Sequence, residues 1–108
     1  MNYKVIALEE FQKEVKKLFK KYKLLKNDIL QLIDKLEENY DIGINLGNNL
    51  YKIRIKNSST NNGKSGGYRV IYYTKLSNNQ IYLMSIFSKS EKENIDISKL
   101  KPLLKKLS

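Results

Sequence analysis

The sequence predicts an α+β domain: a small antiparallel β-sheet packs against an N-terminal helical hairpin, and a short C-terminal helix follows. Two patterns of apolar residues indicate this fold class. Apolar residues recur with helical period over the first 40 residues, and they alternate with period two from residue 51 onward. A chain of 108 residues is long enough for one hydrophobic core, so we expect residues 1–108 to form a single domain.

The first part of the chain predicts one strand and two helices. Residues 4–8 form a short opening strand, and a turn is expected at residues 23–27, with Asn27 or Asp28 capping the second helix. Two amphipathic helices joined by so short a turn make a helical hairpin. Its two apolar stripes consist of Phe11, Val15, Leu18, Phe19 and Tyr22, and of Ile29, Leu32, Ile33, Leu36 and Tyr40.

The second part predicts a three-stranded antiparallel meander and a last helix. Residues 43–49, rich in Gly and Asn, are expected to form a loop. The last helix begins near Leu100, with Pro102 in its first turn and Ser98 as its cap. The resulting order is β-α-α-β-β-β-α, with the meander strands at residues 51–56, 69–74 and 81–88.

Composition limits the chemistry of the chain. It has 21 Lys and Arg against 11 Asp and Glu, a net charge of +10, and neither Cys nor His. Disulfides, thiol nucleophiles and histidine-based catalysis are therefore excluded, and we expect no metal and no cofactor. No apolar run is long enough for a secretory signal or a membrane span, so we expect a cytoplasmic protein without a membrane partner.

The strongest functional signal is a strand with one cationic face. Lys52, Arg54 and Lys56 alternate with Tyr51, Ile53 and Ile55. Arg69 begins the next strand and extends the patch; it and Arg54 are the only arginines of a chain with 19 lysines. Arginine's planar fork grips phosphate through two hydrogen bonds, so we interpret this face as a nucleic-acid-backbone site. The alternative is the solvated face of a lysine-rich protein.

Further residues are candidates for contact with nucleic acid. Tyr68 and Tyr73 flank or follow Arg69, and tyrosine beside cations can stack on unpaired bases; alternation puts Tyr73 on the cationic face. Tyr72 is expected in the core. Lys64 stands in a Gly-rich hairpin tip, and Lys89 and Lys92 follow the last strand at the edge of the sheet.

These segments together resemble the RelE/ParE superfamily of bacterial type II toxins, most closely its RelE/HigB branch. No single segment is specific for the family, whereas the three in this order are more specific in combination. The resemblance covers nearly the whole chain. The three segments are Leu50-Tyr51-Lys52-Ile53-Arg54-Ile55, Gly63-Lys64-Ser65-Gly66-Gly67-Tyr68-Arg69-Val70-Ile71-Tyr72-Tyr73 and Ile86-Phe87-Ser88-Lys89-Ser90-Glu91-Lys92-Glu93-Asn94.

The resemblance implies a ribosome-dependent, metal-independent mRNA endonuclease that is held inactive by a cognate antitoxin. Matched to the family pattern, Lys52 is the candidate base, Arg54 and Arg69 clamp the phosphate, and Lys89 is the acid or another phosphate contact. Lys56, Lys64, Tyr68, Tyr73 and Lys92 are the candidate nucleic-acid contacts.

The chain also departs from the family pattern. In the RelE branch, the position of Ser90 carries an arginine that acts as the general acid. That branch also carries a base-stacking tyrosine near the position of Ile95 or Asp96, where this chain has no aromatic residue. Two alternative functions therefore stay open: a ParE-like toxin that binds and poisons DNA gyrase without cleaving RNA, and a basic RNA-binding domain without catalysis.

Overall fold

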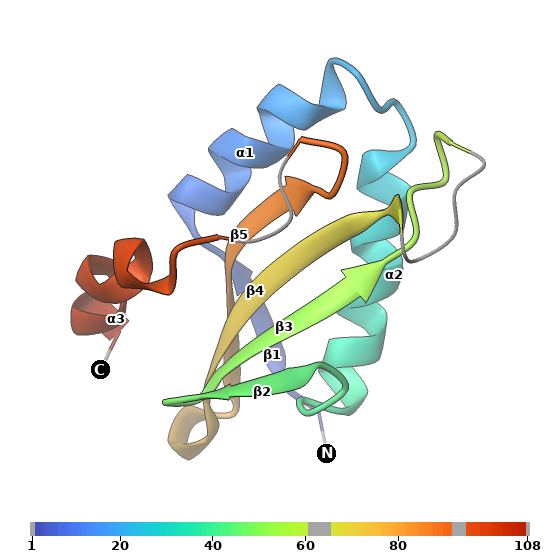
Figure 1. Cartoon of the computed structure of the whole chain (residues 1–108). Helices are drawn as coiled ribbons and strands as arrows, with labels where there is room; N and C mark the ends of the chain where they lie inside the picture. Colours follow the sequence, from blue (N-terminus) through green and yellow to red (C-terminus); the bar gives the residue numbers. More distant parts are fainter. Residues whose placement is uncertain (1, 61–65, 92–94, 108) are drawn as a thin grey trace.

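A computed structural model gives the structure of the chain and describes residues 2–60, 66–91 and 95–107. It confirms the α+β class and the helical hairpin (Figure 1). Short 3₁₀ turns at residues 76–78 and 97–100 complete the chain. The helices and strands are β1 (Lys4–Ala7), α1 (Glu9–Phe19), α2 (Leu25–Glu38), β2 (Ile44–Gly47), β3 (Leu50–Ile55), β4 (Tyr68–Lys75), β5 (Gln80–Ser88) and α3 (Lys101–Leu107).

The strands form one five-stranded sheet in the order β1-β5-β4-β3-β2. The meander β3-β4-β5 is antiparallel as predicted, whereas β1 pairs with β5 in parallel. The opening strand therefore lies beside the last one, and the helical hairpin crosses the sheet between β1 and the meander. A bulge between Ile71 and Tyr72 shifts the register of β4 against β5.

The prediction of a loop at residues 43–49 is wrong, because Ile44–Gly47 form the edge strand β2. Asn48 and Asn49 then turn the chain into β3 with positive φ angles of 54° and 65°. Asparagine tolerates this left-handed conformation, which tight hairpin turns require. Ile44 and Leu46 do alternate with Asn45 and Gly47, but the strand is only four residues long, all four are exposed, and the Gly and Asn residues favour a loop.

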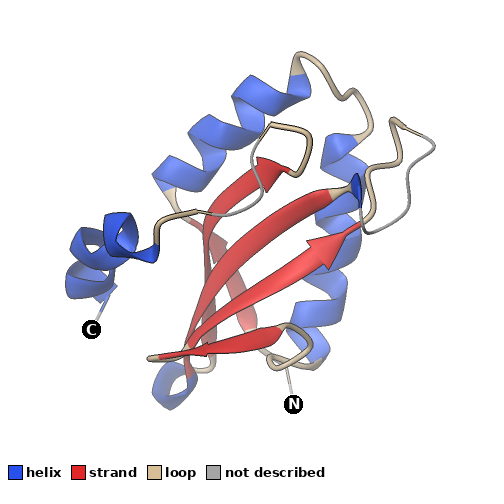
Figure 2. Cartoon of the chain, viewed as in Figure 1, coloured by secondary structure: helices blue, strands red, loops and turns tan. Residues whose placement is uncertain are grey.

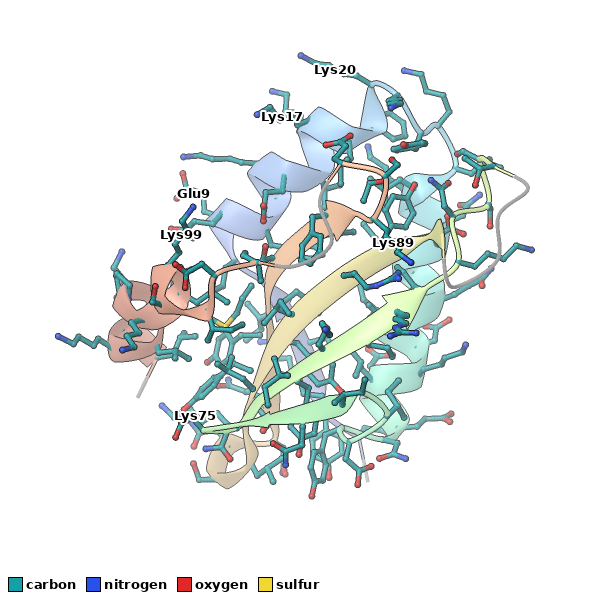
Figure 3. The ribbon with its side chains drawn as sticks, in the orientation of Figure 1. Glu9, Lys17, Lys20, Lys75, Lys89 and Lys99 are labelled. Atoms are coloured by element: carbon teal, nitrogen blue, oxygen red, sulfur yellow. The ribbon has the colours of Figure 1, made fainter. Side chains whose placement is uncertain are left out.

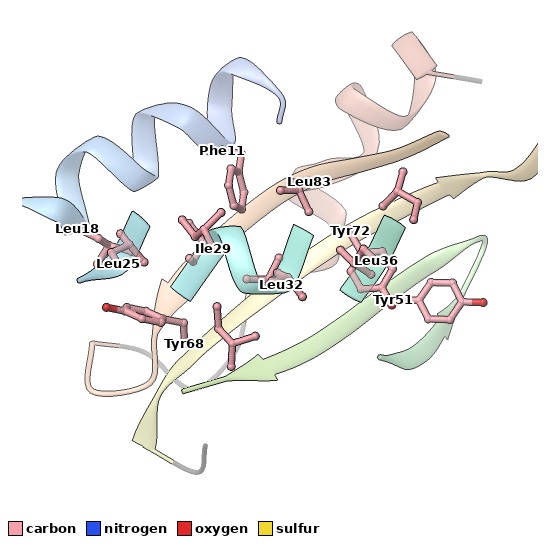
Figure 4. Close-up of a cluster of buried hydrophobic side chains, with 14 of the residues drawn as sticks. Phe11, Leu18, Leu25, Ile29, Leu32, Leu36, Tyr51, Tyr68, Tyr72 and Leu83 are labelled. Atoms are coloured by element: carbon pink, nitrogen blue, oxygen red, sulfur yellow. The ribbon is translucent and has the colours of Figure 1, made fainter. Parts of the chain in front are cut away.

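The main core lies between the hairpin and one face of the sheet (Figure 4). Alternate residues of each strand point to this face. The expected core position of Tyr72 is confirmed, since its side chain is fully buried. The cluster combines Phe11 and Leu18 of α1, Leu25, Ile29, Leu32 and Leu36 of α2, and Tyr51, Tyr68, Val70, Tyr72, Ile81, Leu83 and Ile86 of the sheet.

A second hydrophobic cluster lies on the other face of the sheet, where α3 and the turn before it cover part of the strands. Figure 2 shows α3 standing apart from the helical hairpin. Helix α3 is short and covers only part of this face, where it packs against the apolar residues of the cluster. The buried members of this cluster are Leu50, Ile71, Tyr73, Met84, Phe87 and Leu100.

The helix boundaries differ from the predicted caps. Helix α2 begins at Leu25 without a side-chain cap, so neither Asn27 nor Asp28 is its N-cap. Asp28 is buried instead and accepts hydrogen bonds from Ser58. Before α3, the capping side chain is Asp96, which accepts from the backbone N–H and hydroxyl of Ser98. Pro102 stands in the first turn of α3, as expected.

Candidate active site

The candidate site lies on the sheet face that carries α3, beyond the part that α3 covers. Arg54 of β3 and Arg69 of β4 are direct partners in the register of the two strands, and Phe87 of β5 is the next residue across. Directly opposed residues have Cα atoms about 5 Å apart. Lys52 lies two residues before Arg54 and therefore on the same face.

The cations continue at the end of the sheet where β3 and β5 finish and β4 begins. Lys56 follows β3, and Lys89 follows β5 beside the start of β4 (Figure 3). The backbone N–H of Lys89 donates to the carbonyl of Gly67 at 3.0 Å. Position 67 requires glycine, because an added Cβ would lie 2.0 Å from the carbonyl oxygen of Ile55. The backbone just before β4 therefore lies close both to the end of β3, which precedes Lys56, and to Lys89 after β5.

Exposure differs strongly within this group, which we call the cation cluster: Lys52, Arg54, Lys56, Arg69 and Lys89. Arg54, Lys56 and Lys89 are exposed and Lys52 is half-buried. Arg69 is only 4% exposed, and its Nη1 donates to the carbonyl of Tyr68 at 3.3 Å. The cluster therefore has a buried guanidinium beside exposed cations.

Burial, and then the charge of Arg54, lower the pKa of Arg69. Arginine nevertheless stays protonated in proteins, so two positive charges persist side by side. Their mutual repulsion is relieved when an anion lies between them. Two guanidinium forks on adjacent strands can bind two oxygens of one phosphate, or oxygens of neighbouring phosphates.

The structure corrects the expected role of Tyr68. Its side chain points into the main core and is fully buried, with its ring edge-on to Tyr22 at 5.7 Å. It has no surface on which a base could stack. Alternation is the physical reason, since Tyr68 precedes Arg69 and so faces the opposite side of the sheet.

Tyr73 faces the same side as Arg69, as predicted, but its partner across the strands is Leu50, so it lies nearer to Lys52 than to the two arginines. It is 9% exposed and belongs to the second hydrophobic cluster beneath α3. Four residues separate it from Arg69 along an extended strand, a distance of about 13 Å. The structure therefore does not bring Tyr73 to the arginines, and only a small part of its side chain is exposed for the stacking role predicted for it.

Two further candidates, Lys64 and Lys92, lie outside the described residues. Among the residues that are described, no group of three or more acidic side chains could hold a metal ion. Ser90, which stands at the position of the family's arginine, has a hydroxyl 2.8 Å from that of Ser88 and 3.3 Å from that of Tyr22.

Sequence reasoning missed the polar contacts that border the cluster. Tyr22 and Asp28 were assigned to an apolar stripe and to a helix cap, but both reach loops at the end of the sheet. Their partners, Ser90 and Ser58, lie 68 and 30 residues away in the chain. No local pattern of residues signals such a contact.

Comparison with known protein families shows to which family the chain belongs. The family model described as the RelE toxin of the RelE/RelB toxin–antitoxin system matches residues 9–108. The chain belongs to the RelE toxin family. It is thus a type II toxin by family, and the family implies an antitoxin partner of the RelB type.

Solved structures of E. coli RelE share its fold. A double arginine-to-alanine mutant in the free state has a TM-score of 0.63 and 20% identity, over 86% of this chain and 90% of that one. The isolated toxin has a TM-score of 0.62 and 18% identity, over 98% of this chain and 99% of that one. No curated protein sequence matches the chain. In the described residues, no helix is long and apolar enough to cross a membrane.

Proposed function

We propose that this toxin is an endoribonuclease that cleaves mRNA on the ribosome and so inhibits translation. The observation that supports it is the pairing of Arg54 with Arg69 on the sheet face that α3 leaves open, with Lys52 and Lys89 beside them. Like charges directly opposite one another on neighbouring strands destabilise a sheet. A phosphate between the two guanidinium groups reverses this cost.

The reaction proposed is attack of an RNA 2′-hydroxyl on the adjacent phosphorus. The O2′–P bond forms and the P–O5′ bond breaks, leaving a 2′,3′-cyclic phosphate and a free 5′-hydroxyl. Arg54, which is exposed, binds the non-bridging oxygens, and Arg69, which is 4% exposed, adds positive charge directly beside it. Together they stabilise the charge that develops on these oxygens in the transition state. They supply the positive charge that a metal ion supplies in other nucleases.

Two proton transfers complete the step. Lys52 acts as the general base and accepts the proton of the attacking 2′-hydroxyl. Lys89, exposed at the end of the sheet, acts as the general acid and donates a proton to the leaving 5′-oxygen. Lys56 lies on the rim, where it contacts the RNA backbone; Lys64 and Lys92 are proposed for the same role.

The antitoxin is proposed to neutralise the same surface. A net charge of +10 favours rapid capture by an acidic segment, which would cover the cation cluster or displace α3. Either mode would block access of mRNA to Arg54 and Arg69.

The test is induced expression without antitoxin, followed by mapping of mRNA 5′ ends after a few minutes. We expect new ends inside translated codons, and we expect Arg69→Ala to lower cleavage by about 10²–10³-fold, as loss of one charge-stabilising group does. Arg69→Lys is the matched variant, because it keeps the charge and loses the fork.

Other outcomes would contradict the proposal. Growth arrest with intact mRNA and damaged DNA would indicate gyrase poisoning of the ParE type. Absence of arrest would leave a non-catalytic RNA-binding domain. Full cleavage by a soluble Arg69→Ala variant would remove Arg69 from the site.

A further inference from the structure

We propose that the corner of the helical hairpin, from Tyr22 to Asp28, is a clamp that positions both loops bordering the cation cluster. This inference rests on the proposed function for its catalytic consequence, but the contacts themselves are independent of it. Tyr22 and Asp28 are buried and lie on the helix side of the sheet, opposite to the face that carries Arg54 and Arg69. We therefore assign them a positioning role.

The first arm of the clamp reaches the loop after β5. The hydroxyl of Tyr22 lies 3.3 Å from that of Ser90, and the Ser90 hydroxyl lies 2.8 Å from that of Ser88. The Ser90 backbone N–H also donates to Ser88 at 3.3 Å. Hydrogen bonds from Ser90 and then Ser88 lower the pKa of Tyr22. Tyr22 is 6% exposed and Ser88 is 1% exposed, whereas Ser90, which links their hydroxyls, is an exposed residue.

Lys89 lies between the two serines of this arm. Its own backbone N–H is bound to the carbonyl of Gly67, and the N–H of Glu91 is bound to the carbonyl of Ser88. The backbone on both sides of Lys89 is thereby fixed relative to the start of β4, which carries Arg69. A long lysine side chain is mobile, so the position of its Cα decides which atoms its ammonium group can reach.

The second arm reaches the connection after β3. The carboxylate of Asp28 is 6% exposed and accepts from the Ser58 backbone N–H at 2.9 Å and from the Ser58 hydroxyl at 2.5 Å. Nearby, the Leu24 backbone N–H donates to the Ser59 hydroxyl at 3.0 Å. These contacts hold the segment that directly follows Lys56, on the opposite side of the cation cluster from Lys89.

A clamp of this kind explains why polar groups stand in an otherwise apolar layer. Burying a hydroxyl or carboxylate costs free energy unless the group is hydrogen-bonded. The Tyr22 hydroxyl and the Asp28 carboxylate therefore favour the loop positions in which their serine partners are within hydrogen-bond distance. A displacement of about 1 Å at a reacting group can lower a rate about a hundredfold. The two arms tie the loop ends to the same rigid hairpin, and so fix Lys56 and Lys89 relative to each other.

The first experiment measures backbone amide hydrogen exchange in the free protein, which needs no catalytic activity. In Tyr22→Phe, which keeps the ring against Tyr68, we expect the amides of Lys89 and Glu91 to exchange about fivefold faster. Asp28→Asn should do the same for the Ser58 amide. The control is Tyr82→Phe, which removes a hydroxyl donating to Gln80 at 2.6 Å near the other end of β5. Unchanged exchange at Lys89 in Tyr22→Phe would overturn the clamp.

The second experiment measures single-turnover cleavage of mRNA on purified ribosomes. We expect Tyr22→Phe and Ser90→Ala each to lower the rate at saturating ribosome about tenfold, with the half-saturating ribosome concentration unchanged within twofold. The double variant should lose no more than either single variant, since both remove one contact. Tyr82→Phe should cleave like the wild type.

The outcomes separate the clamp from the proposed function. A rate loss that tracks the loss of thermal stability, with no specific change at Lys89, would make Tyr22 merely structural and overturn the clamp. If the wild type itself cleaves no mRNA, the proposed function fails. Faster exchange confined to residues 88–91 would then still support the clamp, and unchanged exchange would overturn both.

Discussion

Tyr68 and Tyr72 point into the same core, but their hydroxyls differ in hydrogen bonding. The Tyr72 hydroxyl donates to the carbonyl of Tyr40 at 2.8 Å and accepts from the Gly43 N–H at 3.0 Å. The Tyr68 hydroxyl is buried and has no hydrogen-bond partner among the described residues. At the residue scale, one tyrosine therefore stabilises the fold through its hydroxyl and the other does so only through its ring.

This contrast predicts opposite effects of the same substitution. Tyr68→Phe should raise the free energy of unfolding by about 1 kcal/mol, because it removes an unsatisfied buried hydroxyl. Tyr72→Phe should lower it by about 1–3 kcal/mol, because two buried backbone groups lose their partner. Urea denaturation at pH 7 measures both, and equal destabilisation by the two variants would contradict the assignment.

The same pair predicts the response to alkaline pH. Burial raises the pKa of Tyr72 from 10.0 to about 12, and it raises the pKa of Tyr68 further. A pKa raised on folding contributes stability that is complete below the unfolded value near 10 and is lost as pH rises through the folded value. We expect the free energy of unfolding to fall between pH 10 and 12, and less steeply in Tyr68→Phe.

At the scale of elements, the hairpin of β2 and β3 depends on its turn. Asn48 and Asn49 both adopt positive φ, and the carbonyl of Asn49 accepts from the Thr74 backbone N–H at 2.9 Å. This turn connects the exposed edge strand β2 to β3, the strand that bears Lys52 and Arg54.

The turn predicts a stabilising substitution. Asn49→Gly should raise the free energy of unfolding by about 0.5 kcal/mol, because Asn-Gly suits a two-residue turn with positive φ at both positions. Asn49→Ala should lower it by about 1 kcal/mol, because a side chain without a local hydrogen bond disfavours the left-handed region. Thermal unfolding of the two variants checks the sign, and a stabilising alanine would contradict the turn geometry.

At the scale of the whole molecule, the two faces of the sheet have different tasks. One face is covered along its length by the helical hairpin and forms the main core. The other is divided between an apolar part under α3 and the cation cluster. A net charge of +10 attracts any polyanion to the molecule, whereas the cation cluster offers phosphate groups one defined place to bind.

This division predicts how ribosome binding responds to salt. Replacing Lys52 and Arg54 together with alanine should weaken binding and reduce the slope of log K against log salt by about 1.4, or about 0.7 for each single-strand phosphate contact. Lys99→Ala with Lys106→Ala removes the same charge near α3 and should leave the slope closer to that of the wild type. Equal slopes in the two double variants would argue against phosphate contacts at Lys52 and Arg54.

The sequence by itself determined the features that depend on near neighbours in the chain. Helical period predicted the hairpin that became α1 and α2, and alternation predicted that Lys52 and Arg54 share a face opposite to Tyr51 and Ile53. These two inferences succeed because backbone periodicity is a local property that each segment expresses independently. The polyanionic partner that the net charge favours stays a prediction.

Tertiary structure alone decided which distant residues meet. The pairing of Arg54 with Arg69, the burial of Tyr68 and the contact of Tyr22 with Ser90 depend on strand register and on the packing of helices against the sheet. The edge strand β2 pairs with β3 through its backbone, although its residues are rich in Gly and Asn and all exposed. Hydrogen bonds between segments far apart in the chain follow from the assembled fold, and no pattern within either segment encodes them.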